Sequence, residues 1–196
     1  MAKAIQSAGM PAVLVEPGAG GVRNASSRGL PNVVHATLSE AKLHSGSVPA
    51  IGFFDVLEHI PDEQEFLAEV RRVLFPNGLI FLTVPAGRWL WSDDDVQAGH
   101  FRRYTCATLG KTLAVAGFRP IYVSKMFSAL PLPLFLLRTL PSIYGRRRLS
   151  PKSYQGLHKP KTRSLLDWVW RWERSRIAFE RSVPIGTSCI AVAVSA

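Results

Sequence analysis

The feature that most constrains the fold is a pair of apolar segments separated by a charged, helix-forming segment. The first apolar segment, residues 50–54, ends in a turn that carries Asp55, Glu58 and His59. The second, residues 78–84, is apolar throughout, which is typical of a parallel strand covered on both faces. Strand, helix and strand in this order predict a parallel βαβ unit. Its polar turn would lie at the carboxyl end of the first strand, where open α/β sheets bind their ligands.

The helix of this unit is predicted from its periodicity and its charges. Apolar residues recur at spacings of three and four over residues 62–74, so that Val70 and Val73 share one face. Acidic residues at the start, and Arg71 and Arg72 at the end, match the helix dipole. We therefore expect an amphipathic helix here.

The rest of the chain continues this alternation of short apolar segments with helix-forming ones. The expected strands are residues 12–15, 32–35, 50–54, 78–84, 119–123 and 188–194. The expected helices are residues 2–8, 21–27, 62–74, 105–116 and 165–181. Strands that alternate with helices predict an α/β fold with a doubly wound, mostly parallel sheet.

Length and composition indicate a folded domain. The 196 residues fit one domain, and a hydrophobic content of 47% excludes disorder of the whole chain. The start of the chain lacks the apolar core of a signal peptide. The longest apolar segment, residues 126–137, is shorter than the about 20 residues that span a bilayer, so we expect a cytoplasmic protein. Cys106 and Cys189 match no metal-ligand spacing, so we expect reduced thiols and no metal site.

Three sequence blocks together resemble one family. They are FDVLEHIPD at residues 54–62, RVLFPNGLIFLTVPA at residues 72–86 and GHFRRYT at residues 99–105. In these blocks the chain is similar to the second half of a class I S-adenosylmethionine-dependent methyltransferase. The resemblance implies a Rossmann-like core at residues 1–130, completed by an antiparallel last strand at 183–196, with an insertion at 131–182. It also implies methyl transfer from S-adenosylmethionine to an oxygen, nitrogen or carbon nucleophile of an unidentified acceptor.

The first half of the family's fold is expected to be incomplete. In nucleotide-binding folds an acidic residue lies about 20 residues beyond the Gly-rich cofactor loop. Glu16 fits that acidic residue at the end of a second strand, so the first strand and its loop would be missing. Strands 12–15 and 50–54 would then pair directly or leave backbone groups unpaired. The alternative takes residues 18–21 as the cofactor loop, but it leaves no second strand that ends in an acid before Asp55.

The resemblance assigns five positions to the cofactor. Glu16 would bind the ribose hydroxyls, because two carboxylate oxygens match a vicinal diol. Ala36 and Thr37 would form the turn beside the adenine, and Phe53 and Phe54 would flank the adenine or methionine end. Taken alone, Glu16 also fits a solvated acid in a turn.

The acceptor side of the site is expected at the polar turn and in the loop after the next strand. Asp55 would position the acceptor or orient His59, and His59 would act as a general base. His100 would face the same acceptor. The alternative is that Asp55 and Glu58 cap the following helix while His59 packs in a turn. Many class I methyltransferases work mainly by aligning the nucleophile with the methyl group, and these need no dedicated base.

The loop after the second strand of the βαβ unit is rich in groups suited to recognition. The residues expected to contact the substrate are Trp91, Arg102, Arg103 and Tyr104. Arginine binds carboxylate or phosphate in a bidentate manner, and tryptophan stacks on planar or cationic groups. The alternative is a solvated loop in which the two arginines pair with acidic residues 93–95. We expect the acceptor to be a small or lipid-like molecule.

Most of the positive charge lies in one Pro-rich segment. The net charge is +10, from 24 Lys and Arg against 14 Asp and Glu. Residues 131–163 carry no acidic residue, and their basic residues are Arg138, Arg146, Arg147, Arg148, Lys152, Lys159, Lys161 and Arg163. Charge beside apolar residues is typical of a protein that rests on an anionic bilayer, which would make this protein peripheral at the membrane.

Two other interpretations of this segment stay open. The chain could be a non-catalytic methyltransferase-like module that binds an anionic membrane surface or partner, or the segment could be a solvated insertion. Nucleic acid is not expected as a partner, because the segment has no RNA-binding motif.

Overall fold

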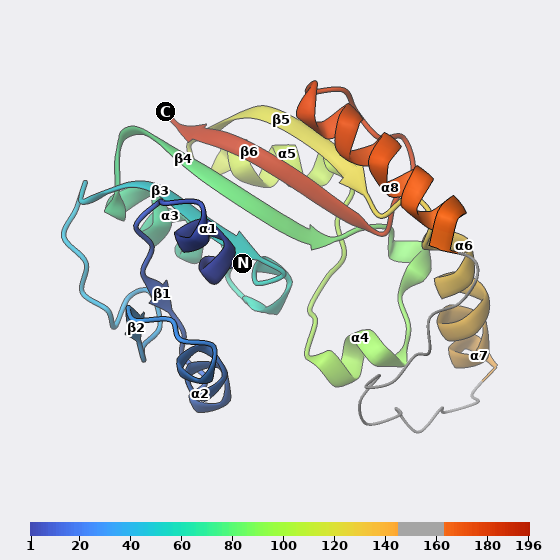
Figure 1. Ribbon diagram of the computed structural model, residues 1–196, viewed down its shortest axis with the longest axis horizontal. Coiled ribbons are helices and arrows are strands. Elements are labelled where there is room, and N and C mark those ends of the chain that lie inside the picture. Colours follow the sequence, from blue (N-terminus) through green and yellow to red (C-terminus); the bar gives the residue numbers. More distant parts are fainter. Residues whose placement is uncertain (145–162) are drawn as a thin grey trace. The chain divides into compact units, whose positions relative to one another are not determined.

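The computed structural model describes residues 1–144 and 163–196, whose helices and strands are labelled in Figure 1. These residues form two compact units, Met1–Ser47 and Val48–Ala196, and each is described by itself. Part of the basic segment lies outside the described residues, and with it the membrane contact expected of Arg146, Arg147, Arg148 and Lys152.

The N-terminal unit is a strand–helix–strand segment preceded by helix α1 (Ala2–Ser7). Strands β1 (Leu14–Val15) and β2 (Val33–Val34) are parallel and lie side by side. Helix α2 (Ala19–Ser27) connects them and is followed by Gly29, whose φ of +72° is a left-handed conformation that glycine adopts without strain. The strands and the helix expected here are confirmed, although both strands are shorter than predicted.

The larger unit is built on a four-stranded sheet in the order β3-β4-β6-β5 (Figure 1). Its strands are β3 (Val48–Phe54), β4 (Leu74–Pro85), β5 (Phe118–Met126) and β6 (Ser188–Ser195). β3 is parallel to β4, and β6 lies antiparallel between β4 and β5. β3, β4 and β5 therefore point the same way, and their carboxyl ends lie at one end of the sheet.

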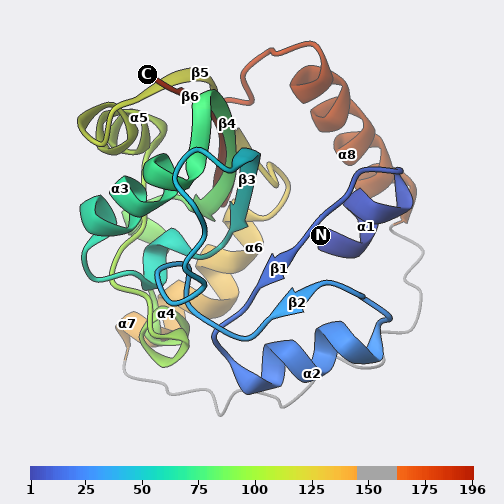
Figure 2. The same cartoon turned by 90° about the vertical axis from the view of Figure 1, so that its left-hand side faces the viewer.

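Helices α3 (Glu63–Val73) and α5 (Cys106–Val115) lie on one side of this sheet, as Figure 2 shows. Asp62 caps α3, because its Oδ1 accepts two backbone N–H groups of the first turn at 3.1 and 3.0 Å. Thr105 caps α5 in a reciprocal capping box that Thr108 completes. Both helices are predicted from the sequence and confirmed.

The core of the larger unit includes the apolar faces of these two helices. Leu67, Val70 and Val73 of α3 are fully buried, and they form the face that the periodicity predicts. Leu109 and Leu113 of α5 are fully buried as well. Burial contributes about 1.5–3 kcal/mol for each such side chain, which holds both helices firmly on the sheet.

Helix α8 (Arg163–Ala178) lies on the other side of the sheet (Figure 2). Its buried residue Glu173 accepts hydrogen bonds from the N–H groups of Phe127 at 2.7 Å and Ser128 at 2.8 Å. Both donors follow β5, and Phe127 has a φ of +63°. The carboxylate therefore satisfies backbone donors at the point where the chain turns away from the sheet.

Short helical segments occupy stretches that the sequence predicts as loops. The loop after β4 contains η2 (Arg88–Leu90) and α4 (Asp93–Ala98). The Pro-rich segment begins with α6 (Pro131–Leu134), a π-helical turn η3 (Phe135–Thr139) and α7 (Leu140–Ile143). Pro131 is tolerated because it is the first residue of α6, where the missing N–H has no intrahelical partner to lose.

The basic residue at the start of this Pro-rich segment is already paired. Arg138 of η3 forms an ion pair with Asp94 of α4. Both side chains remain more than a third exposed, so this contact contributes little to stability.

The fold class is confirmed as α/β, with mostly parallel strands and an antiparallel last strand. Hydrogen bonding divides the six strands into the β1–β2 pair and the four-stranded sheet, rather than one continuous sheet. Among the described residues of the larger unit, no strand pairs with the edge of β3 away from β4. Across these same residues, every helix is too short or too polar to cross a bilayer.

Candidate active site

The chain leaves β3 through Asp55, whose φ of +51° turns the backbone sharply out of the sheet. The N–H of Asp55 donates to the Thr83 carbonyl of β4 at 2.9 Å, and the Thr83 hydroxyl donates to Asp55 Oδ1 at 3.2 Å. Aspartate tolerates this left-handed conformation better than most residues. The exposed carboxylate is therefore anchored where two parallel strands end.

The turn η1 (Leu57–His59) follows, and it points one side chain inward and the next outward. Glu58 is 1% exposed, whereas His59 is exposed. The carbonyl of Glu58 accepts a hydrogen bond from the N–H of Phe101 at 2.8 Å. This bond fastens the segment that follows β4 onto η1.

The Glu58 carboxyl group is buried without a full set of partners. Its Oε2 atom has no hydrogen-bond partner among the described residues. Burial raises the pKa of Glu58 to about 7, with a further contribution from the negative charges of Asp55 and Asp95, while Arg103 opposes the shift. Buried carboxyl groups are normally paired, so this one marks a candidate functional site.

Asp95, on α4, accepts hydrogen bonds from several residues of the segment that follows β4. Its buried Oδ1 accepts from Arg103 Nε at 2.8 Å and from His100 Nδ1 at 2.9 Å. Its Oδ2 accepts from Arg103 Nη2 at 3.1 Å and from the Ser92 N–H at 2.9 Å. Burial acts to raise the pKa of Asp95, but the hydrogen bonds from Arg103 and His100 outweigh it and lower that pKa. Ionised Asp95 can only accept, so His100 Nδ1 carries the proton and Nε2 is the acceptor of the neutral ring.

His100 and His59 face each other from the two segments. Their ring centroids are 4.7 Å apart and the ring planes meet at 75°, an edge-to-face arrangement. The potential ligand atoms of Glu58, His59 and His100 all lie within 4.8 Å of one another. The structure thus brings together His59 and His100, two of the three predicted catalytic residues. The negative charge of the third, Asp55, contributes to the raised pKa of Glu58. Their catalytic roles stay predictions.

A second cluster forms around Glu63 at the start of α3. Its Oε2 lies 2.9 Å from Arg102 Nη1 and accepts the Tyr104 hydroxyl at 2.5 Å, while Oε1 accepts from Thr112 at 3.2 Å. Arg102 also donates to the Pro61 carbonyl at 2.7 Å. Burial, reinforced by the Glu63 contact, raises the pKa of Tyr104, so this hydroxyl stays protonated.

The residues predicted to contact the substrate differ in whether they are paired within the protein and in how exposed their side chains are. Arg103 pairs with Asp95, as the paired-loop alternative expects, whereas Arg102 pairs with Glu63. Trp91, directly after η2, is 36% exposed. Substrate contact stays a prediction for all of these residues, and of them Trp91 offers the most accessible side chain.

In the N-terminal unit, Glu16 lies between β1 and α2. Its Oε1 accepts the Gly18 N–H at 2.9 Å, at the start of the helix. A Cβ atom on Gly21 would collide with the Glu16 carboxyl carbon, and one on Gly18 would come within 2.9 Å of Oε1. These glycines therefore make room for the Glu16 carboxylate.

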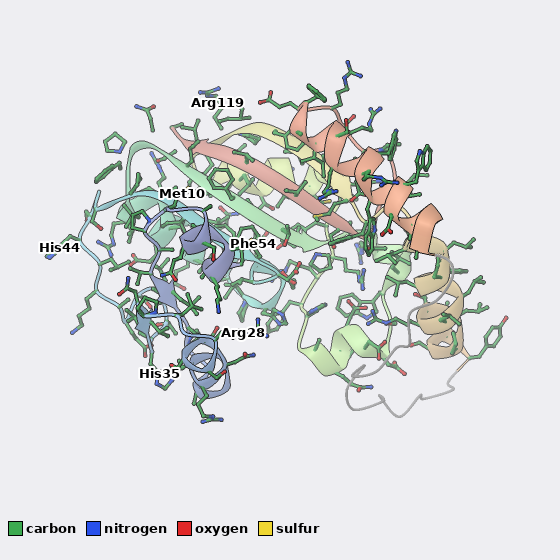
Figure 3. All side chains as sticks on the ribbon, in the orientation of Figure 1. Met10, Arg28, His35, His44, Phe54 and Arg119 are labelled. Atoms are coloured by element: carbon green, nitrogen blue, oxygen red, sulfur yellow. The ribbon has the colours of Figure 1, made fainter. Side chains whose placement is uncertain are left out.

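The turn after β2 holds the other two predicted cofactor residues of this unit, Ala36 and Thr37. Figure 3 labels His35 in this region, and its Nε2 lies 3.1 Å from the Pro17 carbonyl. Thr37 donates to the Glu40 carboxylate through its N–H at 2.9 Å and its hydroxyl at 2.8 Å. The turn is therefore well ordered by local hydrogen bonds.

Phe53 and Phe54 alternate along β3, so they point to opposite faces of the sheet. Phe53 is 6% exposed and packs edge-to-face on Phe66 of α3, with centroids 5.4 Å apart. The ring of Phe54, labelled in Figure 3, covers Gly52, where an added Cβ would come within 2.9 Å of it. Both residues have a packing role, and their contact with the cofactor stays a prediction.

Sequence reasoning missed the importance of Glu58 and Asp95. It considered Glu58 as a helix cap, but Asp62 caps α3 instead. It considered Asp95 as one residue of a loop rich in recognition groups and as a partner of the arginines. A signal was available for Asp95, since Ser92 and Asp95 have the spacing of a capping box, which the structure shows.

Comparisons with known proteins agree with this architecture. Residues 1–123 match a family model described as a methyltransferase domain. A relative in Mycolicibacterium smegmatis, named "probable S-adenosylmethionine-dependent methyltransferase", is 33% identical over 90 residues, covering 44% of this chain and 35% of the relative. A Mycobacterium tuberculosis protein with that description is 32% identical over 98 residues, covering 48% and 35%. The chain thus matches about a third of the length of each relative.

Solved structures give the same fold. A SAM-dependent methyltransferase from Archaeoglobus fulgidus matches with a TM-score of 0.62 at 14% identity, over 98% of this chain and 79% of that one. A geranyl diphosphate C-methyltransferase from Streptomyces coelicolor matches with a TM-score of 0.59 at 12% identity, over 99% and 68%. The family match covers well over half of the chain, which therefore belongs to the methyltransferase domain family and has its Rossmann-like fold.

Proposed function

We propose that the chain catalyses methyl transfer from S-adenosylmethionine to a small or lipid-like acceptor. The proposal rests on the gathering of Asp55, Glu58, His59 and His100 at the carboxyl ends of β3 and β4, where folds of this type bind their ligands. Family membership supports the same reaction, because the named relatives are S-adenosylmethionine-dependent methyltransferases.

Methyl transfer makes modest chemical demands on the protein. Bound S-adenosylmethionine supplies a methyl group on a sulfonium, which the acceptor's nucleophile displaces in line. An oxygen or nitrogen nucleophile also loses a proton, and His59 would take it up while Asp55 positions the acceptor or orients His59. His100 would face the acceptor with its Nε2, since Asp95 holds the other ring nitrogen.

The proposed cofactor residues keep the roles that the family resemblance assigns. Glu16 would accept hydrogen bonds from the ribose hydroxyls, and its fixed carboxylate at the end of β1 fits that role. Ala36 and Thr37 would form the adenine-side turn. Phe53 and Phe54 would flank the adenine or methionine end.

A binding experiment tests this proposal directly. Calorimetry would measure the affinity of the chain for S-adenosylmethionine and for its demethylated product. We expect Glu16→Ala to weaken binding about tenfold or more, because a charged hydrogen bond contributes about 1.5–3 kcal/mol. Glu65→Ala, which removes an exposed carboxylate from α3, is the matched control and should bind like the parent.

Two outcomes would count against different parts of the proposal. Absence of binding by the folded chain would refute the proposed reaction. Equal binding by Glu16→Ala would refute only the ribose role of Glu16. Because Glu16 also contacts the start of α2, circular dichroism must first show that the variant keeps its helices.

A further inference from the structure

Glu58, His59 and His100 carry potential ligand atoms that all lie within 4.8 Å of one another. We propose that these three side chains bind one divalent transition-metal ion, with zinc as the best-suited occupant. The sequence alone predicts no metal, because the three residues belong to two segments that only the fold brings together. Metal binding at this cluster stands independently of the proposed methyl transfer.

The spacing of the three donors suits a shared ion after a small closing movement. Zinc lies about 2.0–2.2 Å from imidazole nitrogens and carboxylate oxygens, so its ligand atoms are about 3–4 Å apart. His59 is exposed, so its ring can turn toward the other two donors without disturbing the core. The hydrogen bond from the Phe101 N–H to the Glu58 carbonyl, at 2.8 Å, already holds the neighbouring His100 segment against η1.

The second, independent observation is the Glu58 carboxyl group itself. The residue is 1% exposed, and its Oε2 has no hydrogen-bond partner within the part of the chain that the structure describes. Burying an unpartnered carboxylate is unfavourable, and a cation bound to Oε2 removes that penalty. A buried carboxylate oxygen without a partner, beside two imidazole rings, is the arrangement expected of a metal ligand.

His100 is already oriented as a metal ligand. Asp95 Oδ1 accepts a hydrogen bond from His100 Nδ1, 2.9 Å away, which leaves the lone pair of the ring on Nε2. Asp95 is in turn fixed by Arg103 at 2.8 and 3.1 Å and by the Ser92 N–H at 2.9 Å. Metal-binding histidines almost always have such a partner on the second nitrogen, because it sets the tautomer and the ring orientation.

The donor set indicates which ion is bound and what it offers. Two imidazoles and one carboxylate suit zinc and neighbouring transition metals, whereas magnesium and calcium prefer sites made of oxygen atoms alone. Three protein ligands leave a coordination position for water or for another oxygen donor. On the proposed function, an acceptor hydroxyl bound there would have its pKa lowered and would lose its proton to water, so that with the ion present His59 would be a ligand and not the base.

The experiment uses the untagged full chain after dialysis against EDTA. Zn²⁺ would be titrated in a calorimeter, and Co²⁺ would be titrated while its visible absorption is recorded. The background carries Cys106→Ser, because the Cys106 and Cys189 sulfur atoms lie 3.7 Å apart and thiols bind the same metals. We expect one ion per chain and a rise in Tm on metal addition.

Four variants assign the ion to the cluster. His59→Ala and His100→Ala should each weaken Zn²⁺ binding by tenfold or more, and Asp95→Asn by about 10–100-fold through the lost support of His100. Glu58→Gln should have two opposite effects: Zn²⁺ binding falls at least tenfold, while the Tm of the metal-free chain rises because the buried charge is gone. A purely structural glutamate would not give that pair of effects. His44→Ala, an exposed histidine of the other unit, is the matched control and should bind Zn²⁺ like the parent.

Two results would overturn the proposal. One is the absence of Zn²⁺ or Co²⁺ binding by the folded Cys106→Ser chain. The other is binding that His59→Ala and His100→Ala weaken no more than His44→Ala does. In either case the two histidines keep the proposed role of general base and acceptor contact without a metal.

Discussion

Replacing Asp95 by alanine tests whether one buried ion pair holds the segment after β4. The Asp95 side chain is fully buried and that of Arg103 is 6% exposed. Without the carboxylate, the guanidinium keeps the Ala86 carbonyl at 3.1 Å as its hydrogen-bond partner among the described residues. The variant therefore leaves a positive charge inside the protein with most of its donors unsatisfied.

The size of the effect follows from that unpaired charge. Breaking a buried ion pair from one side costs about 3–5 kcal/mol, and donors of His100 and Ser92 lose their acceptor as well. These losses overlap, so we expect Asp95→Ala to lower the free energy of unfolding by about 4 kcal/mol. Adding Arg103→Met removes the uncompensated charge, and the double variant should recover about half of the loss.

Urea denaturation followed by tryptophan fluorescence measures this change. All five tryptophans lie in the larger unit, so the signal reports on the unit that contains Asp95. The matched control is Asp94→Ala, the preceding residue of α4, whose partner Arg138 is 39% exposed. This control should cost less than about 1 kcal/mol. If Asp95→Ala costs no more than Asp94→Ala, the network does not stabilise the segment and the reasoning fails.

The same pair makes the stability depend on pH in a defined direction. Folding lowers the pKa of Asp95, whose ordinary value is 3.8. Its contribution is therefore fully present above that ordinary value and is lost as the pH falls through the folded-state value. The stability difference between the parent and Asp95→Ala should shrink in acid below about pH 4. A difference that stays constant down to pH 2 would contradict this assignment.

Two further predictions concern Cys106 and Glu173. A hydrogen bond from Cys189, assisted by Lys125, lowers the pKa of Cys106, so the midpoint of its alkylation by iodoacetamide should lie below the ordinary thiol pKa. Cys189→Ala should move that midpoint toward the ordinary thiol value and Cys189→Ser should not, whereas a parent midpoint of 8.5 would refute the contact. Glu173→Ala leaves the Phe127 and Ser128 N–H groups unpaired and should cost about 2–4 kcal/mol in urea denaturation, with exposed Glu180→Gln as the control.

Elements with local signals were predictable from the sequence. The helix α3 is capped by Asp62 and carries buried apolar residues at spacings of three and four. Both signals involve residues within about one helical turn of each other, so a short stretch of sequence shows them. Thr105 and Thr108 mark the start of α5 in the same way. The apolar segment 78–84 predicted the strand β4, but its expected coverage on both faces is wrong, because Ile80, Leu82 and Val84 are fully buried whereas Phe81 between them is 38% exposed.

Features that depend on contacts between distant segments were not predictable. Cys106 and Cys189 are far apart in the sequence, yet their sulfur atoms lie 3.7 Å apart. The prolines of the segment after β5 suggested irregular structure, but Pro131 falls at the first position of a helix, where proline is favourable. When the flanking residues are all apolar, the neighbouring sequence does not indicate whether a proline begins a helix or prevents one.

The loop after β4 shows how the same side chains can be assigned to two roles. Arginines in a loop beside a ligand-binding end suggest recognition of an anionic group, but a guanidinium satisfies its donors equally well inside the protein. Here Asp95 pairs with Arg103 and Glu63 pairs with Arg102, so each arginine has an acidic partner within the protein. Both acids come from helical N-termini, where carboxylates are favourable in any case.

The internal pairing of Arg102 and Arg103 limits which side chains can recognise the acceptor. With both arginines and Tyr104 engaged, the exposed groups that follow β3 and β4 include the Asp55 carboxylate, the His59 ring and the Trp91 ring, together with Arg88, Trp89 and Phe101. A carboxylate and an aromatic surface favour a neutral or cationic acceptor over an anionic one, since Asp55 repels negative charge and Trp91 stacks on cations. We therefore expect a neutral or cationic acceptor, and an acceptor phosphate or carboxylate would need a countercharge, from exposed Arg88 or from a metal ion at His59.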